Sequence, residues 1–203
     1  MDLTKYQALI FDMDGTLIDS MPAHVGSWQK TCEEFEIPFD EVWLHSLGGM
    51  PTIKTAQAII DKFGLDQHPQ LLAETKFRHY ESLTHKGNII PATVDILKAH
   101  RKDKKVAVGT GCMIRHADEL LTVTGLMPLL DAVVTASDVT NHKPHPDTFL
   151  KAAKLVGVEP KDCVVFEDTL LGQRAALAAG MDCILVTEGK ISTFTAATTG
   201  CER

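Results

Sequence analysis

Two aspartates separated by one residue follow the first apolar run of the chain. Asp12 and Asp14 come directly after Ala8-Leu9-Ile10-Phe11, which has the length and composition of a buried strand that ends in a turn. A single Asp in such a position is most often a turn former. Two on one turn can also serve as a nucleophile and an acid/base group, if their surroundings hold their pKa values apart.

Further polar residues follow three later apolar runs. Thr110-Gly111 ends one run, Glu167-Asp168 ends another, and Lys143 lies beyond a third. Clustered carboxylates raise one another's pKa unless a cation lies among them, and an all-oxygen set of ligands is suited to Mg²⁺. A hydroxyl, a glycine amide and an ammonium group are suited to the oxygens of a phosphate. The residue types therefore predict magnesium-assisted phosphoryl chemistry.

The elements that must position these residues alternate between short apolar strands and amphipathic helices. Such a pattern predicts a parallel sheet with helices on both faces, a doubly wound α/β fold, which binds ligands at the carboxyl ends of its strands. Strands are expected near 8–11, 106–110, 132–135, 163–167 and 183–186, and the intervening helices begin near 93 and 146 or lie near 114–124 and 171–179.

The segment from about Pro22 to His85 has helical periodicity throughout and no convincing strand. Because the strand at 8–11 belongs with the later sheet, this segment is predicted to be an insertion. We expect a core made of residues 1–18 and 88–203, and a helical domain at 19–87. The Thr- and Ala-rich stretch from 187 to 203 carries no structural signal.

Composition is that of an ordinary globular protein. The 203 residues are 44% hydrophobic and 23% charged, with a formal net charge of −7, which argues against disorder and against the cationic surface of a nucleic-acid-binding protein. No apolar stretch is long enough to span a membrane and no basic leader is evident, so a cytoplasmic protein without membrane contact is expected. The cysteines form no C-x-x-C pair and are expected to be small core or loop residues of a reducing compartment; they are Cys32, Cys112, Cys163, Cys183 and Cys201.

These residues resemble the motifs of a known family. The sequence Asp12-Met13-Asp14-Gly15-Thr16, then Thr110, then Lys143-Pro144, then Glu167-Asp168 is similar in type and order to four motifs of the haloacid dehalogenase superfamily of phosphohydrolases. The stretches 143–147 and 167–181 resemble its β-phosphoglucomutase-like subfamily, and within that the bacterial fructose-1-phosphate phosphatase type. The resemblance implies a Rossmann-like core with a helical cap inserted after the first motif, hinged near 16–20 and 84–91.

The resemblance also implies a role for each carboxylate. Asp12 is expected to attack phosphorus and form an aspartyl-phosphate, so it must stay ionised. Asp14 is expected to protonate the leaving alcohol and then to activate water, so it must take up a proton. Mg²⁺ is expected on Asp12, the backbone carbonyl of Asp14, and Asp168, with Glu167 behind the metal or bound to it through water.

The phosphoryl oxygens are expected to contact Thr110, the Gly111 amide and Lys143, again by resemblance. Thr110 taken alone is as easily a helix cap, and Lys143 taken alone a solvated surface lysine. Three residues of the helical segment match cap positions that approach the substrate in the subfamily, although packed or hydrogen-bonded side chains give the same pattern: His24, Trp28 and Lys76. The other histidines form no metal-ligand spacing and are expected mostly at the surface.

The preferred interpretation is Mg²⁺-dependent hydrolysis of a small sugar phosphate, such as fructose 1-phosphate or 6-phosphogluconate, by a monomer. The subfamily's mutase needs a second phosphate site, and uncharged residues occupy the matching positions here, namely Gly48, Thr52, Met113 and Ile114. A β-phosphoglucomutase-type phosphomutase remains the alternative. A catalytically silent phosphate-binding protein is disfavoured because both aspartates are present. A dinucleotide-binding loop at 109–114 is disfavoured because Ile114 stands where a third glycine is needed.

Overall fold

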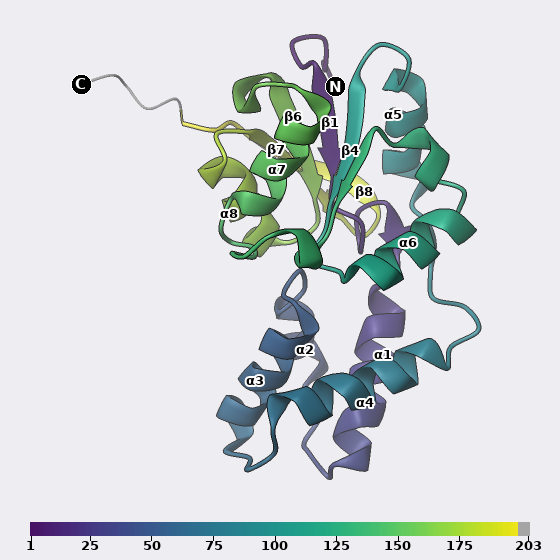
Figure 1. The fold of residues 1–203 in the computed structure, drawn as a ribbon, viewed down its shortest axis with the longest axis vertical. Coiled ribbons are helices and arrows are strands. Elements are labelled where there is room, and N and C mark those ends of the chain that lie inside the picture. The colour runs from purple at the N-terminus through teal and green to yellow at the C-terminus, as the bar shows by residue number, and fades with distance from the viewer. Residues whose placement is uncertain (199–203) are drawn as a thin grey trace.

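The computed structural model describes residues 1–198 as a sheet-based part and a helical part that lie end to end along the long axis (Figure 1). Six strands form the main sheet in the order β5-β4-β1-β6-β7-β8. The first strand, β1 (Ala8–Phe11), lies between β4 (Lys105–Gly109) and β6 (Cys163–Glu167) and is parallel to both. Strands β5 (Ala132–Val134) and β7 (Asp182–Thr187) continue the parallel arrangement outward. This is the α/β class expected from the sequence.

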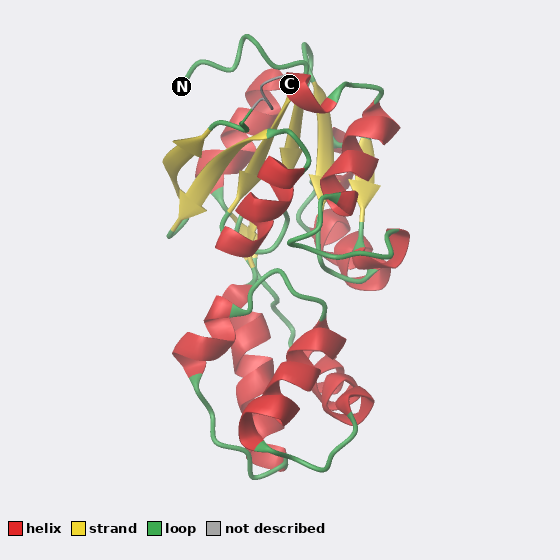
Figure 2. Cartoon of the chain, turned by 90° about the vertical axis from the view of Figure 1, so that its left-hand side faces the viewer, coloured by secondary structure: helices red, strands yellow, loops and turns green. Residues whose placement is uncertain are grey.

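The central strands are apolar except for Lys105 at the start of β4 and Glu167 at the end of β6, because helices cover both faces of the sheet (Figure 2). Leu9 and Phe11 of β1 belong to one buried cluster and Ile10 to the cluster on the opposite face, as the alternation of side chains in a strand requires. The first cluster includes residues of α5 (Pro91–His100) and α6 (Ile114–Val123), and the second includes residues of α7 (Asp147–Val156) and α8 (Leu170–Ala178).

Strand β8 (Lys190–Thr195) lies in the stretch for which the sequence carries no signal. It pairs with β7 in the antiparallel direction at the edge of the sheet. An edge strand buries few side chains, and Phe194 is 52% exposed, so the apolar pattern of a central strand is missing. Cys201 lies outside the described residues. Three short 3₁₀ helices complete the sheet-based part, at Met127–Leu129, Ala136–Asp138 and Pro160–Asp162.

Four helices fill the interval that the sequence predicts to be helical. They pack around their own apolar cluster, which includes Trp28, Ile59 and Leu72. The short helix α2 (Glu41–Ser46) has six residues, which are too few to show an apolar repeat of their own. The helices are α1 (Met21–Glu34), α2 (Glu41–Ser46), α3 (Thr52–Phe63) and α4 (Pro69–Glu81).

The chain leaves and re-enters the sheet-based part through two adjacent segments. Strands β2 (Ile18–Asp19) and β3 (Asn88–Ile89) form a two-residue antiparallel pair there. The hydroxyl of Thr93 also donates to the carbonyl of Thr16 at 2.5 Å. The predicted boundaries at 18/19 and 87/88 fall at this pair of strands, and the division into a core domain and a cap domain stays a prediction. Within residues 1–198, no helix has the length and apolarity to cross a bilayer.

Candidate active site

Three carboxylates meet at the carboxyl ends of β1 and β6. Asp12, Glu167 and Asp168 each have an oxygen within 4.8 Å of the others. The pairing of the two strands sets this arrangement, since the amide of Asp12 donates to the carbonyl of Phe166 at 2.9 Å. Burial and the neighbouring carboxylates raise the pKa of Asp12 well above its ordinary value, against the opposing effect of Lys143, and raise that of Asp168 to about 7.

Lys143 lies between two of these carboxylates. Its ammonium group donates to Oδ1 of Asp12 at 2.5 Å and to Oε1 of Glu167 at 2.7 Å, and the side chain is 1% exposed. Burial alone lowers the pKa of a lysine, but the two carboxylates raise the pKa of Lys143 above its ordinary value. Lys143 is therefore a buried cation that holds Asp12 in place, and it does not lie on the surface.

Glu167 faces Lys143 and the start of α8. Its Oε2 accepts hydrogen bonds from the amide of Thr169 at 2.6 Å and from the hydroxyl of the same residue at 2.8 Å. A side chain at Gly172 would collide with the Glu167 carboxylate, so a glycine is required at that position of α8. Both oxygens of Glu167 thus have protein donors, and the residue lies behind Lys143.

Asp14 faces the helical part. The hydroxyl of Ser20 donates to Oδ1 of Asp14 at 2.5 Å, and Nε2 of His24 lies 3.4 Å from the same oxygen. The Lys76 ammonium lies 2.7 Å from Nδ1 of His24. An ammonium can only donate, so Nδ1 accepts and the ring proton resides on Nε2, facing Asp14.

These contacts set the pKa values around Asp14. Burial raises the pKa of Asp14, but the adjacent His24 ring, the hydrogen bond from Ser20 and the charge of Lys76 outweigh it, and the net pKa is lowered. Burial lowers the pKa of Lys76 to about 8. The protein's own groups therefore place the pKa of Asp12 above that of Asp14. The resemblance implies the opposite order of the two pKa values. A divalent cation among the carboxylates, and a phosphate beside Asp14, would each act to restore the expected order.

Thr110 and Gly111 follow β4 at the same edge of the sheet. The amide of Thr110 donates to the carbonyl of Val134, and its hydroxyl accepts a hydrogen bond from the amide of Cys112 at 3.0 Å. A Cβ on Gly111 would lie 2.5 Å from the carbonyl oxygen of Gly49, in the loop between α2 and α3. The glycine therefore allows the helical part to approach the sheet-based part closely.

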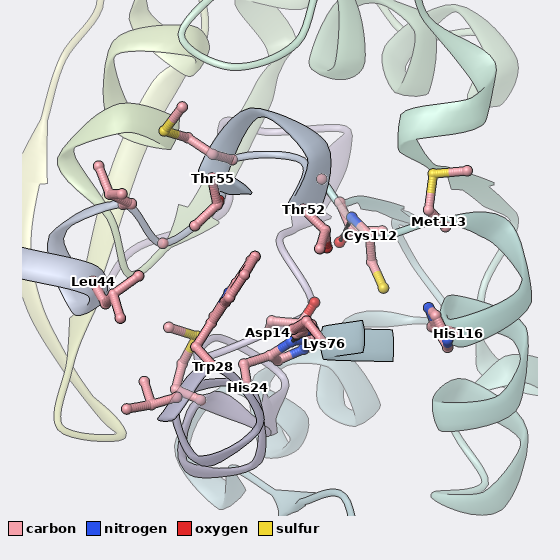
Figure 3. A pocket seen from close by; sticks show the side chains of 18 of the residues that line it. Asp14, His24, Trp28, Leu44, Thr52, Thr55, Lys76, Cys112, Met113 and His116 are labelled. Atoms are coloured by element: carbon pink, nitrogen blue, oxygen red, sulfur yellow. Dashed lines mark hydrogen bonds and ion pairs between the residues drawn. The ribbon is translucent and has the colours of Figure 1, made fainter. Parts of the chain in front are cut away.

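A pocket of about 80 Å³ lies between the two parts and is lined by residues of both (Figure 3). Asp12, Asp14, Thr110 and Gly111 lie on the sheet side. The three residues expected to approach the substrate lie on the helical side, so the fold brings them to the same cavity as the two aspartates; they are His24, Trp28 and Lys76. Lys143 and Glu167 are buried beneath Asp12 and do not line the cavity.

The positions matched to a second phosphate site carry no charge in this pocket. Gly48, Thr52 and Met113 line it, while Ile114 is largely exposed. Lys76 is the one lysine or arginine among the lining residues of the described chain. The single ammonium group of the pocket already faces His24. The pocket therefore offers no separate group of cations that could bind the second phosphate of a bisphosphate.

Two residues of the site were not found from the sequence. Ser20 directly precedes α1, where a serine commonly caps the helix. Its hydroxyl instead donates to Asp14 and makes no cap hydrogen bond. The expectation that the remaining histidines lie mostly at the surface is wrong for His116, which is 7% exposed and lines the pocket. No local pattern marks a single buried histidine on an amphipathic helix.

The chain belongs to the haloacid dehalogenase-like hydrolase family, whose profile it matches over residues 9–186. It is similar to fructose-1-phosphate phosphatase YqaB of Escherichia coli (strain K12), with 41% identity over 180 residues that cover 89% of this chain and 96% of that protein. β-Phosphoglucomutase of Bacillus subtilis (strain 168) is 29% identical over 192 residues, 91% of this chain and 84% of that protein. The crystal structure of a hydrolase from Pseudomonas syringae superposes with a TM-score of 0.81 at 28% identity, over 90% of this chain and 85% of that one. The family resemblance and the fold class are confirmed, and the protein is a phosphoric monoester hydrolase.

Proposed function

We propose that the protein is a Mg²⁺-dependent phosphatase that hydrolyses a small sugar monophosphate through an aspartyl-phosphate on Asp12. The observation that carries the proposal is the pocket that holds Asp12 and Asp14 together with His24 and Lys76 of the helical part. The similarity to a fructose-1-phosphate phosphatase makes fructose 1-phosphate the first substrate to test, with 6-phosphogluconate the second. The absence of charge at the positions matched to a second phosphate site favours hydrolysis over phosphoryl shuttling.

The carboxylate cluster fits a divalent cation. Asp12, Glu167 and Asp168 bring three carboxylates together against one ammonium, that of Lys143. The raised pKa values of Asp12 and Asp168 reflect this excess of buried negative charge, which a hard cation with oxygen ligands relieves. Asp12, Asp168 and the carbonyl of Asp14 would hold Mg²⁺, which supplies positive charge to the phosphoryl oxygens.

The first chemical step is transfer of the phosphoryl group to Asp12. Lys143 holds Oδ1 of Asp12 and thereby fixes the direction of the other carboxylate oxygen, which attacks phosphorus. The bond between phosphorus and the ester oxygen breaks, and Asp14 gives its proton to the departing alkoxide. Thr110, the Gly111 amide and Lys143, beside Oδ1 of Asp12, contact the phosphoryl oxygens.

The second step is hydrolysis of the aspartyl-phosphate. Asp14, now ionised, removes a proton from water as the water attacks phosphorus, which releases inorganic phosphate and restores the Asp12 carboxylate. Asp14 is ionised in the free protein because its pKa is lowered. The negative charge of a bound phosphate raises that pKa, so the acid form is favoured once substrate is bound.

Residues 19–87 act as a cap over this site. His24, which Lys76 contacts, reaches Asp14 only when the helical part lies against the sheet-based part, as it does here. The paired segments β2 and β3 are the hinge about which the cap opens to admit substrate. Closure removes water from the cavity before Asp12 is phosphorylated. We also propose that the protein is a cytoplasmic monomer with a small phosphate ester as its partner, without nucleic-acid or membrane contacts.

The test is release of inorganic phosphate from fructose 1-phosphate, 6-phosphogluconate and β-glucose 1-phosphate, with Mg²⁺ or with a chelator. We expect Mg²⁺-dependent release from at least one ester and none from the Asp12→Asn variant. Undiminished release by Asp12→Asn or in chelator would reject the mechanism. Conversion of β-glucose 1-phosphate to the 6-phosphate with a bisphosphate primer would favour the mutase, and binding of phosphate and Mg²⁺ without turnover would favour the silent binding protein.

A further inference from the structure

A chain of ring contacts runs from a helix of the sheet-based part into the helical part. His116 of α6 stacks on Phe77 with 5.0 Å between ring centroids and lies edge-on to Tyr80 at 5.5 Å, and both partners belong to α4. Tyr80 in turn stacks on His24 of α1 at 4.6 Å. Figure 3 places His116 beside Cys112 and Met113 at the pocket. His116 thus contacts Phe77 and Tyr80 across the boundary between the two parts, and Tyr80 contacts His24, which lies beside Asp14.

Tyr80 contacts both members of the pair that faces Asp14. Its ring stacks on His24, and the Lys76 ammonium lies 4.6 Å from its centroid and 2.7 Å from Nδ1 of His24. A cation over an aromatic face is attracted to it, and stacking restricts the orientation of both rings. Tyr80 is fully buried. A shift of its ring would therefore move both His24 and Lys76.

His116 contributes to this chain through its ring and not through a hydrogen bond. Its Nε2 is buried without a hydrogen-bond partner and lies 3.8 Å from Oε1 of Glu81, beyond hydrogen-bond distance. Burial, together with the charge of Lys76, lowers the pKa of His116, so the ring is neutral. A neutral flat ring can seat Phe77 and Tyr80 without carrying a charge into the pocket.

We propose that His116 is a positioning residue whose ring seats Phe77 and Tyr80 when the helical part closes, and thereby holds His24 and Lys76 against Asp14. The role rests on the proposed function, because it matters only if Asp14 donates a proton to the leaving group. His116 then acts from outside the reacting atoms, through the contacts that connect α6, α4 and α1.

A comparison of two esters tests this role. An alkoxide leaving group, as in fructose 1-phosphate, needs the proton of Asp14, whereas nitrophenolate leaves without one. For His116→Ala we expect kcat/KM to fall about 10-fold or more with fructose 1-phosphate, and less than about 3-fold with p-nitrophenyl phosphate. The ratio kcat/KM covers the steps up to phosphorylation of Asp12, so hydrolysis of the intermediate does not affect it.

Two variants distinguish the ring contact from other roles. His116→Phe keeps a flat ring without nitrogen atoms, and we expect it to restore kcat/KM for fructose 1-phosphate to within about 3-fold of the unaltered protein. Glu81→Gln removes the nearby carboxylate, and we expect it to leave both esters unaffected. Thermal unfolding monitored by circular dichroism establishes that each variant is folded.

The outcomes separate the two proposals. An equal loss on both esters, no loss on either, or no rescue by His116→Phe would overturn the positioning role. A differential loss reproduced by Glu81→Gln would assign it to the carboxylate and also overturn the ring contact. Failure of the unaltered protein to release phosphate from any ester would reject the proposed function itself, and this role with it.

Discussion

The hydroxyl of Ser20 donates a 2.5 Å hydrogen bond to Oδ1 of Asp14, at the point where the chain passes from the sheet-based part into α1. The bond ties the proposed acid/base group to the segment about which the helical part is expected to move. Asp14 is therefore held from both sides, by Ser20 at the junction and by His24 on α1. The orientation of the acid depends on the position of the helical part.

Replacement of Ser20 by Ala removes one of these two contacts. Because the lost hydrogen bond is made to a charged acceptor, we expect kcat/KM for an alkyl phosphate to fall about 5- to 30-fold. The matched control is Ser27→Ala, since among residues 1–198 the Ser27 hydroxyl bonds only to the Ala23 carbonyl within α1. Steady-state phosphate release measures both. Equal activities of the two variants would contradict a role for Ser20 in holding Asp14.

Removal of Lys143 leaves two buried carboxylates without their cation. Lys143→Ala is expected to lower the free energy of unfolding by about 3–5 kcal/mol, because uncompensated buried charge is costly, and to abolish activity. Urea denaturation gives the free energy. Lys151→Ala serves as the control, since the partly exposed Lys151 ammonium lies 3.5 Å from Oδ1 of Asp138 and donates to the Asp138 carbonyl at 2.6 Å, and its loss should cost less than about 1 kcal/mol. Similar losses of unfolding free energy in the two variants would contradict the expectation that the burial of Lys143 sets the cost of removing it.

Mg²⁺ binding should stabilise the protein and should weaken in acid. Binding at 100 times the dissociation constant adds about 2.7 kcal/mol. The pKa of Asp168 is raised to about 7 by burial and by Glu167, so protons compete with the cation, and Mg²⁺ affinity falls as the pH drops through that value. Thermal unfolding against Mg²⁺ concentration at pH 8 and pH 6 measures this. Asp168→Asn should show no response to the ion, and a full response in that variant would place the cation elsewhere.

Asp182 connects the ends of the described chain and should contribute pH-dependent stability. Its carboxylate is 15% exposed and accepts hydrogen bonds from Lys5 at 2.8 Å, from the hydroxyl of Tyr6 at 2.6 Å and from the amide of Ala197 at 2.9 Å. Burial opposes ionisation, but these donors lower the pKa of Asp182 overall. The stabilisation is therefore complete above the unfolded pKa of about 3.9 and is lost as the pH falls through the lower folded value.

The substitution Asp182→Asn tests this pH dependence. At pH 7 we expect the variant to unfold with a free energy lower by about 2 kcal/mol. Below the folded pKa the Asp182 carboxyl is neutral, as the Asn amide is at every pH, so the difference should narrow. Urea denaturation over a pH series compares the two, and a difference that stays constant or grows in acid would contradict the assignment.

Gly111 is expected to be needed for closure of the helical part. A Cβ there would lie 2.5 Å from the Gly49 carbonyl oxygen, so Gly111→Ala should hold the two parts slightly apart and lower kcat/KM at least about 10-fold. Gly26→Ala in α1 is the control, because the added Cβ has no neighbour within 4 Å beyond its own stretch of helix and Ala favours a helix. Activity of Gly111→Ala equal to that of the control would contradict this role.

Local sequence patterns were sufficient to predict most of the sheet-based part. The apolar runs at β1, β4, β5, β6 and β7 are continuous because these strands are covered on both faces, and continuous apolar runs are visible in the sequence. Asp12, Thr110 and Asp168 follow such strands directly, so the topology of a parallel sheet brings them to one edge. β8 has no such pattern because most of its side chains are exposed, whereas those of β5 at the opposite edge are buried or partly buried.

The order of residues along the chain is enough to show which residues end the strands, and therefore that carboxylates, a threonine and a glycine gather at one edge of a parallel sheet. Three features become visible only in the folded chain: Lys143 lies buried between Asp12 and Glu167, Ser20 bonds to Asp14, and His116 packs against the rings of α4. These features depend on contacts between segments far apart in the chain. Periodicity reports only which face of an element is apolar, and it carries no information about which distant side chain that face meets.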